Sequence, residues 1–215
     1  MVVLNPNGEY IVTFDPLDGS SVVDANMSVG SIFGIWKKRE ETSDSMSGYT
    51  GRDLVGAALA SYGPRTSCLV YNTLLKQVDE ISLHKRLSEE EIRAEKAKQD
   101  SEMWFDEHLL AWTFQRRNLQ MKDTTSIYAP GNTRACLHNK AYMNLYTEWA
   151  RRGFTLRYSG AMAPDCFLVL VKEEGLFVSL SAEDKGVKAK LRVLFECVPI
   201  AFLVEMTGGM TSFGD

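Results

Sequence analysis

The chain has no apolar run of the roughly 18–20 residues that a membrane-spanning helix requires. Long runs of lysine and arginine are also absent and the net charge is −4, so neither nucleic acid nor a membrane is expected as a partner. The stretch MVVLNPNGEY has no basic segment followed by a long apolar one, so no targeting segment is expected there. The 215 residues, 45% of them hydrophobic, fit a globular protein of one large or two small domains.

Cysteine is sparse and widely spaced. Cys68, Cys136, Cys166 and Cys197 each stand in an apolar context, and no two of them form a CxxC pair. A zinc site is therefore not expected. The four residues are typical of buried free thiols in a protein from a reducing compartment.

Strand-like and helix-like segments are mixed along the chain, which favours an α/β or α+β fold. We predict strands where β-branched and aromatic residues stand between turn formers, and helices where apolar residues recur at helical spacing. The predicted strands are 10–14, 28–36, 66–71, 78–83, 166–171 and 175–180, and the predicted helices are 51–63, 141–153 and 190–209. Glycines at 153 and 208 are expected to end the last two helices.

Residues 85–117 differ in composition from the rest of the chain. Ser88 and Glu91 have the spacing of a capping box, and the following residues form no continuous apolar stripe. Apolar residues return in the second half of the segment. We interpret 85–117 as a helical insertion and assign no chemistry to it.

The most informative stretch is YIVTFDPLDGSS, in which a hydrophobic strand leads directly into a turn. Asp15 and Asp18 are three residues apart across that turn, so both carboxylates can converge on one point. Pro16 restricts the backbone, and Gly19 permits a positive φ with which the chain can fold back. The amides that follow Gly19 then point the same way and form a concavity suited to an anion.

Two carboxylates beside such a concavity suit Mg²⁺ or Mn²⁺, which prefer oxygen ligands and bind substrate phosphates. A metal ion next to a phosphate cradle is typical of phosphate-ester hydrolysis. The alternative is an aspartate-rich surface turn, which a bare DxxD pattern would favour. The full string DPLDGSS is more specific than that pattern.

This string resembles the signature of the fructose-1,6-bisphosphatase family, part of a larger lithium-sensitive phosphatase group. GRDLVGAALASYG, RYSGAMAPD and KAKLRVLFECVPIAFLVEMTGG are similar to further family segments and occur in the family's order. The resemblance implies a layered α-β-α-β-α sandwich. We expect a metal- and phosphate-binding domain at 1–125 and a sugar- and distal-phosphate-binding domain at 126–215.

Within the family, YAPGNTRA (128–135) and KAKLR (188–192) look like the sedoheptulose-1,7-bisphosphatase branch. LFVSLS lacks the tyrosine that fructose enzymes place after this strand. The expected activity is therefore removal of the 1-phosphate from sedoheptulose 1,7-bisphosphate. Fructose 1,6-bisphosphate remains open as the alternative or as a second substrate.

The resemblance also implies a metal site. Its ligands would be Asp15, Asp18, the main-chain carbonyl of Leu17, and Glu196. From the residues alone, Glu196 is unusual because a lone carboxylate in the apolar run VLFECVPIAF needs a partner, a cation or access to solvent. The family pattern favours a metal ligand there, with two to three Mg²⁺ or Mn²⁺ ions per site.

Substrate-binding roles follow from the same resemblance. The amides of Gly19 and Ser20 would hold the 1-phosphate, Lys190 the sugar phosphate and Tyr158 the distal phosphate. Met162 would pack along the sugar, and Arg157 would reach a neighbouring subunit's site in a homodimer or homotetramer. Asn132 and Arg134 are further candidates for the distal phosphate, although Asn132 also fits a plain loop asparagine in a left-handed conformation.

The implied mechanism is in-line attack on phosphorus by a metal-activated water, with Asp15, Asp18 and Glu196 as the catalytic carboxylates and no covalent intermediate.

The compartment would be the cytoplasm or a plastid. Complete members carry about a hundred further residues before the signature, a length typical of a whole domain. The chain is therefore expected to expose apolar surface and to hold part of the catalytic set. A related inositol or nucleotide phosphatase and a non-catalytic sugar-phosphate-binding remnant remain as alternatives.

Overall fold

A computed structural model of the chain describes residues 5, 7–39, 46–83, 90, 103–105 and 111–213. Its larger sheet has the strand order β1-β2-β3-β4-β5-β7-β6, and every neighbouring pair is antiparallel. Its strands are β1 (Tyr10–Asp18), β2 (Val29–Lys37), β3 (Leu54–Tyr62), β4 (Thr66–Asn72), β5 (Gln77–Leu83), β6 (Met103–Phe105) and β7 (Ala111–Arg116).

The smaller sheet is parallel and has the order β10-β8-β9. Its strands are β8 (Ile127–Gly131), β9 (Thr155–Leu156) and β10 (Leu176–Ser179). The helices of the second half are α2 (Lys140–Arg151), α3 (Met162–Lys172) and α4 (Val198–Met206). Short turns of helix are η1 (Ser20–Val22), η2 (Gly51–Asp53), η3 (Thr133–Leu137), η4 (Glu183–Lys185) and the π-type turn η5 (Val193–Cys197).

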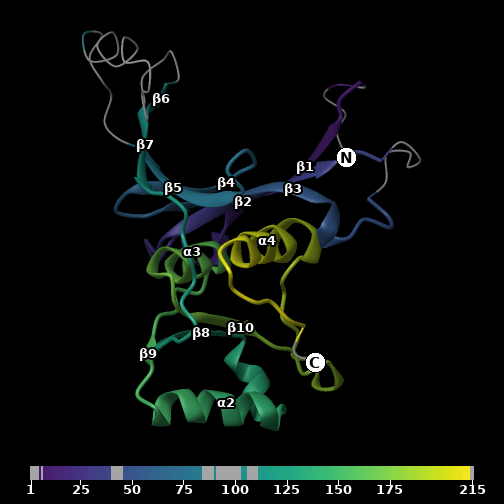
Figure 1. Ribbon diagram of the computed structural model, residues 1–215. Coiled ribbons are helices and arrows are strands. Elements are labelled where there is room, and N and C mark those ends of the chain that lie inside the picture. Colours follow the sequence, from purple (N-terminus) through teal and green to yellow (C-terminus); the bar gives the residue numbers. More distant parts are fainter. Residues whose placement is uncertain are drawn as a thin grey trace.

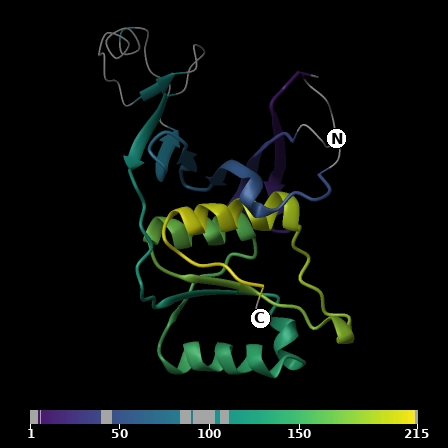
Figure 2. The ribbon, with the colours of Figure 1, turned by 45° about the vertical axis from the view of Figure 1, so that its right-hand side comes forward.

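The elements stack in layers (Figures 1 and 2). Helices α3 and α4 lie between the two sheets, and α2 covers the far side of the smaller sheet. This is the α+β layering expected of the sugar-phosphatase sandwich. Among the described residues, no helix packs on the other face of the larger sheet, where Tyr10, Val12 and Phe14 are 53–56% exposed. The expected exposure of apolar surface is therefore present on that face.

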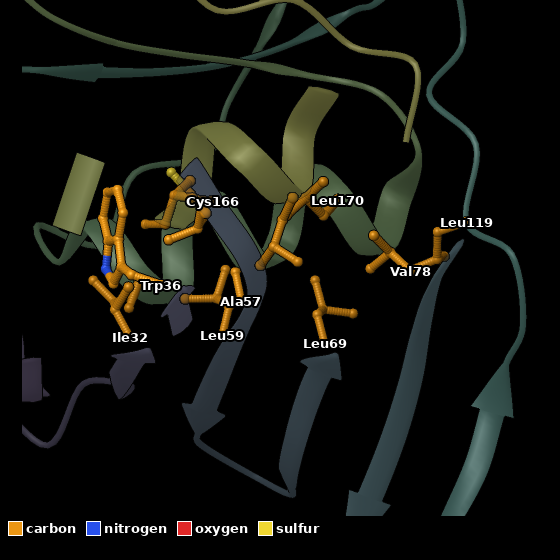
Figure 3. Close-up of a cluster of buried hydrophobic side chains, with 13 residues drawn as sticks. Ile32, Trp36, Ala57, Leu59, Leu69, Val78, Leu119, Cys166 and Leu170 are labelled. Carbon is orange, nitrogen blue, oxygen red and sulfur yellow. The ribbon is translucent and has the colours of Figure 1, made fainter. Parts of the chain in front are cut away.

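The main hydrophobic core joins the larger sheet to α3 and α4 (Figure 3). Ile32, Leu59 and Leu69 of the sheet belong to one cluster with Leu170 of α3 and Leu203 of α4, and all five are fully buried. A second cluster around Tyr142 packs α2 on the smaller sheet. The core of the first half of the chain thus depends on helices from the second half, which fixes the two halves against each other.

Five of the six predicted strands and one helix are confirmed with small shifts at their ends. The helix predicted at 51–63 is wrong, since it is the short turn η2 followed by strand β3. Its alanines and leucines favour a helix in isolation, but β3 lies in the sheet between β2 and β4 and packs on both helices. Tertiary contacts override the weak local preference.

The strand predicted at 166–171 is also wrong, because CFLVLV belongs to α3. A short continuous apolar run is compatible with a buried strand and with a buried helix, and α3 lies between two sheets. The helix predicted at 190–209 is confirmed only in part. It starts as the π-type turn at Val193 and continues as α4 up to Met206, after which Gly208 adopts a φ of 84°.

The interpretation of 85–117 as helical is wrong for most of the residues that the structure describes there, although residue 90 is helical. Residues 103–105 and 111–116 are strands β6 and β7, which extend the larger sheet beyond β5. The capping-box residues 88 and 91 lie outside the described residues. The domain boundary near residue 125 stays a prediction.

All four cysteines are free, two of them buried. Within the described ranges, no helix has the length and apolar character needed to cross a bilayer.

Candidate active site

The site is built around the turn that ends β1. The register between β1 and β2 shifts between Asp15 and Asp18, which produces a local bulge in the strand. The Ser31 hydroxyl donates to the Pro16 carbonyl at 2.7 Å, and the Leu17 amide donates to Oδ1 of Asp15 at 3.0 Å. These bonds fix the turn from both sides and keep its two carboxylates at the same edge of the sheet.

Gly19 is required by two features of this turn. Its φ is 95°, and a Cβ at this position would lie 2.6 Å from the Cβ of Ala161 and 3.2 Å from Cγ1 of Val29. Only glycine avoids both the backbone strain and the collision. The short helix η1 begins at the next residue.

Glu196 approaches the same point from the opposite end of the chain. It lies in the π-type turn η5, between the irregular segment before Val193 and α4. Carboxylate oxygens of Asp15, Asp18 and Glu196 all lie within 4.8 Å of one another. Asp15 is 6% exposed and Glu196 is 1% exposed, so two of the three acids are withdrawn from water.

The oxygens of the three acids are only partly satisfied by protein donors. The Ala163 amide donates to Oδ2 of Asp18 at 2.6 Å, and the Arg192 amide donates to Oε2 of Glu196 at 2.7 Å. Oε1 of Glu196 is buried without a hydrogen bond, although the Arg192 side chain lies at ion-pair distance, 3.0 Å. This oxygen and its neighbours form an oxygen-only donor set that suits a hard divalent cation.

The electrostatics also favour a cation. Burial raises the pKa of Asp18, and the nearby charge of Asp15 adds to the rise. Burial likewise raises the pKa of Glu196, and the neighbouring Asp15 carboxyl group adds to the rise. The Arg192 guanidinium lies 3.6 Å from Asp15 and supplies one positive charge against three carboxylates. A divalent cation would compensate the remaining negative charge.

These acids lie in a cleft of about 490 Å³. Eleven of the twelve predicted site residues line it, and the structure therefore brings together positions from both ends of the chain: Asp15, Leu17, Asp18, Gly19, Ser20, Asn132, Arg134, Tyr158, Met162, Lys190 and Glu196. Arg157 is the exception. It is exposed, and its guanidinium contacts the carbonyl of the adjacent Leu156.

The cleft also contains a basic group of side chains. Arg134, Lys188 and Lys190 line it, and none of the three has an acidic partner within ion-pair distance among the described residues. The side-chain amide of Asn132 donates to the Leu180 carbonyl at 2.7 Å, and its φ is 48°. This bond ties η3 to the chain that leaves β10. The cleft thus offers a second place for an anion.

Sequence reasoning missed two charged residues of the cleft. Arg192 and Lys188 flank Lys190 in KAKLR, a cluster of three cations just before Glu196, and that density of charge was the available signal. Ser179 at the end of β10 also lines the cleft. A single serine at a strand end carries no signal that distinguishes it from others.

Comparison with known proteins agrees with this architecture. Residues 1–89 match the family profile described as fructose-1-6-bisphosphatase, N-terminal domain. Residues 121–215 match the profile described as fructose-1-6-bisphosphatase, C-terminal domain.

Individual relatives include two kinds of sugar bisphosphatase. The chain is 38% identical over 208 residues to a chloroplastic sedoheptulose-1,7-bisphosphatase of Spinacia oleracea, with 97% of this chain and 46% of the relative covered. It is 37% identical over 215 residues to a class 1 fructose-1,6-bisphosphatase of Pelobacter propionicus, with 99% and 56% covered. The chain therefore spans about half the length of these curated relatives.

A solved structure shares the fold. The crystal structure of Leishmania major fructose-1,6-bisphosphatase in the T-state has a TM-score of 0.73 and 27% identity to this chain. That match covers 94% of this chain and 58% of the other.

Proposed function

Because the chain belongs to the fructose-1,6-bisphosphatase family, we propose that the protein is a metal-dependent phosphatase that removes the 1-phosphate from sedoheptulose 1,7-bisphosphate. Fructose 1,6-bisphosphate is the alternative or second substrate. The observation that carries the proposal is the placement of three carboxylates within 4.8 Å of one another in a cleft that also contains three cations without an acidic partner among the described residues.

The carboxylates of Asp15, Asp18 and Glu196 and the carbonyl of Leu17 would hold Mg²⁺ or Mn²⁺, two to three ions per site. The buried oxygen of Glu196 that lacks a hydrogen bond supports this assignment. When bound, such ions supply charge neutralisation at the phosphate and a more acidic water.

The chain's own groups would bind and orient the reacting phosphate. Gly19 and Ser20 line the cleft at the start of η1, where their backbone N–H groups would hold an anion. Arg192 lies 3.6 Å from Asp15 and 3.0 Å from Glu196, so it holds these two acids in fixed orientation. A phosphate placed at this turn would meet donors on one side and the carboxylate group on the other.

The remaining groups of the cleft would hold the distal end of the sugar. Tyr158 would contact the distal phosphate, with Asn132 and Arg134 as further candidates. Lys190 would contact the sugar phosphate, and Met162 would pack along the carbon chain. Arg157 is exposed and does not line this chain's own cleft, which supports a role in a neighbouring subunit of a homodimer or homotetramer.

The longer, seven-carbon sugar is supported by the small residues at the ends of β8 and β10. Gly131 and Ser179 pair in the parallel sheet, and a Cβ at Gly131 would lie 3.0 Å from the serine side chain. Ser179 lines the cleft with a short side chain, which leaves room that a bulky residue would fill.

The test is phosphate release from sedoheptulose 1,7-bisphosphate, fructose 1,6-bisphosphate and an inositol monophosphate, each with Mg²⁺ and with excess chelator. Release from the bisphosphates that requires Mg²⁺, with sedoheptulose preferred, supports the proposal. Equal release from the monophosphate would favour a related phosphatase of the lithium-sensitive group. No release, together with retained binding of the bisphosphates, would favour a non-catalytic binding protein.

A further inference from the structure

Asp165 is a buried acid next to the cleft that has no role in the site described above. It lies in the first turn of α3 and is 4% exposed. Oδ1 accepts a hydrogen bond from the Ser159 amide at 2.7 Å, whereas Oδ2 is buried without a hydrogen bond among the described residues. Within the same residues, no cation lies at ion-pair distance from it. A buried carboxylate without a counter-ion destabilises the folded protein, which suggests that this residue is kept for a functional role.

The segment that Asp165 holds contacts the site at several points. Tyr158, Gly160 and Met162 line the cleft. The Cβ of Ala161 lies against Gly19, 2.6 Å from where a Cβ there would stand. The Ala163 amide donates to Asp18 at 2.6 Å. Residues 158–163 therefore contact the metal-site acid, the phosphate turn and the sugar groove at once.

The same segment has few anchors of its own. Before it, the Arg157 amide donates to the Tyr128 carbonyl at 2.9 Å, and after it α3 begins. Between these points Gly160 has a φ of 96° and Tyr158 is 44% exposed. The bond from the Ser159 amide to Asp165 spans this turn from its middle to the helix.

Burial raises the pKa of Asp165, the polar groups of Ser159 and Gly160 lower it, and the nearby charge of Asp18 adds to the rise. Among the described residues, the hydrogen-bond donor to this carboxylate is the Ser159 amide, which belongs to the turn itself.

We propose that Asp165 is a positioning residue of the cleft: by accepting the Ser159 amide, it sets the course of 158–163 and thereby the places of Tyr158, Met162 and the Ala163 amide. The predicted effect of Asp165 on turnover rests on the proposed function. Its predicted effect on the structure of residues 158–163 does not depend on that function. Position 165 requires a side-chain oxygen that can accept the hydrogen bond of the Ser159 amide at this distance. Asparagine has such an oxygen on a side chain of the same length, and leucine has none.

The experiment compares wild-type protein with Asp165→Leu and Asp165→Asn. Asp79 offers a matched control because it is 2% exposed, accepts the Asn118 amide at 2.9 Å, and also has one oxygen without a hydrogen bond. Asp79 does not line the cleft. The control variant is Asp79→Leu. Each protein is measured for hydrogen–deuterium exchange of the peptide covering 157–163 and for kcat and KM with the preferred bisphosphate.

The leucine variant at 165 is expected to speed exchange in 157–163 about tenfold and to raise KM about tenfold, the change expected when a buried amide loses its acceptor. The asparagine variant should restore both quantities to within about threefold of wild type, and the control should leave both unchanged. Exchange and KM in Asp165→Leu that match the Asp79→Leu control would overturn the proposal, as would an asparagine variant as damaged as the leucine variant.

Two arms keep the result interpretable. If Asp165→Leu loses its cooperative unfolding transition, the proposal is tested instead by the hydrogen exchange of the Ser159 amide in the wild-type protein. Protection against exchange of at least about tenfold is expected for a hydrogen-bonded amide, and free exchange would overturn the assignment. If wild-type protein releases no phosphate from either bisphosphate, the proposed function fails, while the exchange data still test the positioning of 158–163.

Discussion

Oδ2 of Asp18 accepts a hydrogen bond from the amide of Ala163 at 2.6 Å, across 145 positions of sequence. The donor lies in the first turn of α3, whose N-terminal end carries a partial positive charge that favours a carboxylate. The acid that ends β1 is therefore held by an element from the second half of the chain. The turn that follows β1 and the cleft wall are joined through this contact.

Replacement of Asp18 by asparagine should abolish turnover and leave the fold intact. The amide oxygen can still accept from Ala163, and the change removes one charge from a crowded group of acids. Because burial raises the pKa of Asp18, its ionised form destabilises the metal-free protein at neutral pH. Without metal, Asp18→Asn should melt about 2–4 °C higher than wild type, while phosphate release falls below about 1% of wild type.

Calorimetry and phosphate release measure these two quantities. Asp24→Asn removes the same charge from an exposed residue outside the cleft and serves as the control. A lower melting temperature or the loss of the cooperative transition in Asp18→Asn would show that the residue is structural.

Replacement of Gly19 by alanine should be far more damaging than Gly186→Ala. Both glycines have positive φ, 95° and 71°, so both variants pay the backbone strain of about 1 kcal/mol. At Gly186 a Cβ would meet nothing within 4 Å, whereas at Gly19 it would collide with Ala161. Denaturant unfolding should show about 1 kcal/mol lost for Gly186→Ala and about 2–4 kcal/mol for Gly19→Ala, which should also lose phosphate release. Equal losses would mean that the turn and Ala161 move apart freely.

Replacement of Lys190 by methionine should weaken binding of the bisphosphate. The side chain lines the cleft without an acidic partner among the described residues, so its charge is available to a substrate phosphate. A charge-assisted hydrogen bond of this kind contributes about 1.5–3 kcal/mol, which corresponds to a KM about ten- to a hundredfold higher. Lys140→Met, exposed at the start of α2 and outside the cleft, is the matched control. Steady-state kinetics that show the same KM for both variants would remove Lys190 from the substrate site.

Replacement of Tyr142 by phenylalanine should cost stability in a pH-dependent way. Its hydroxyl is fully buried and donates to the Gly131 carbonyl at 2.6 Å, and burial raises its pKa above the ordinary value. Near pH 8 the loss of this bond should lower the free energy of unfolding by about 1–2 kcal/mol. Above about pH 10 the unfolded chain ionises this tyrosine and the folded chain does not, so wild-type stability falls as pH rises.

Phenylalanine cannot ionise, so the difference between the two proteins should shrink between about pH 9 and 11. Urea unfolding at several pH values measures it. Tyr10→Phe changes an exposed tyrosine and should stay within about 0.5 kcal/mol of wild type. A difference for Tyr142→Phe that is constant across this pH range would contradict the assignment.

The turn after β1 was predictable because its residues are chemically unusual: acids, proline and glycine in fixed order constrain the backbone and the ligand together. The convergence of Glu196 with that turn followed from a resemblance, since nothing local in VLFECVPIAF tells which distant element it meets. The π-type turn that places it has no clear sequence signal.

The errors in the fold have a common cause. β3 and α3 are both buried among other elements, so neither has a polar face. Their sequences therefore lack the alternation of polar and apolar residues by which a helix is distinguished from a strand. From sequence alone, alanine-rich β3 therefore favours a helix and apolar α3 a strand. Sequence reasoning does not identify Lys188, Arg192 and Asp165. Lysine, arginine and aspartate are common residues, and only the folded structure shows that these three lie at or next to the cleft.

The central claim is that Asp15, Asp18 and Glu196 together bind a divalent cation, and Mn²⁺ binding measured by electron paramagnetic resonance tests it most directly. Wild-type protein and Glu205→Gln, which alters an exposed glutamate on α4, should bind Mn²⁺ equally. Glu196→Gln should weaken that binding about tenfold or more, because it removes one charged ligand from the group. Equal Mn²⁺ binding by all three proteins, or none by wild type, would contradict the claim.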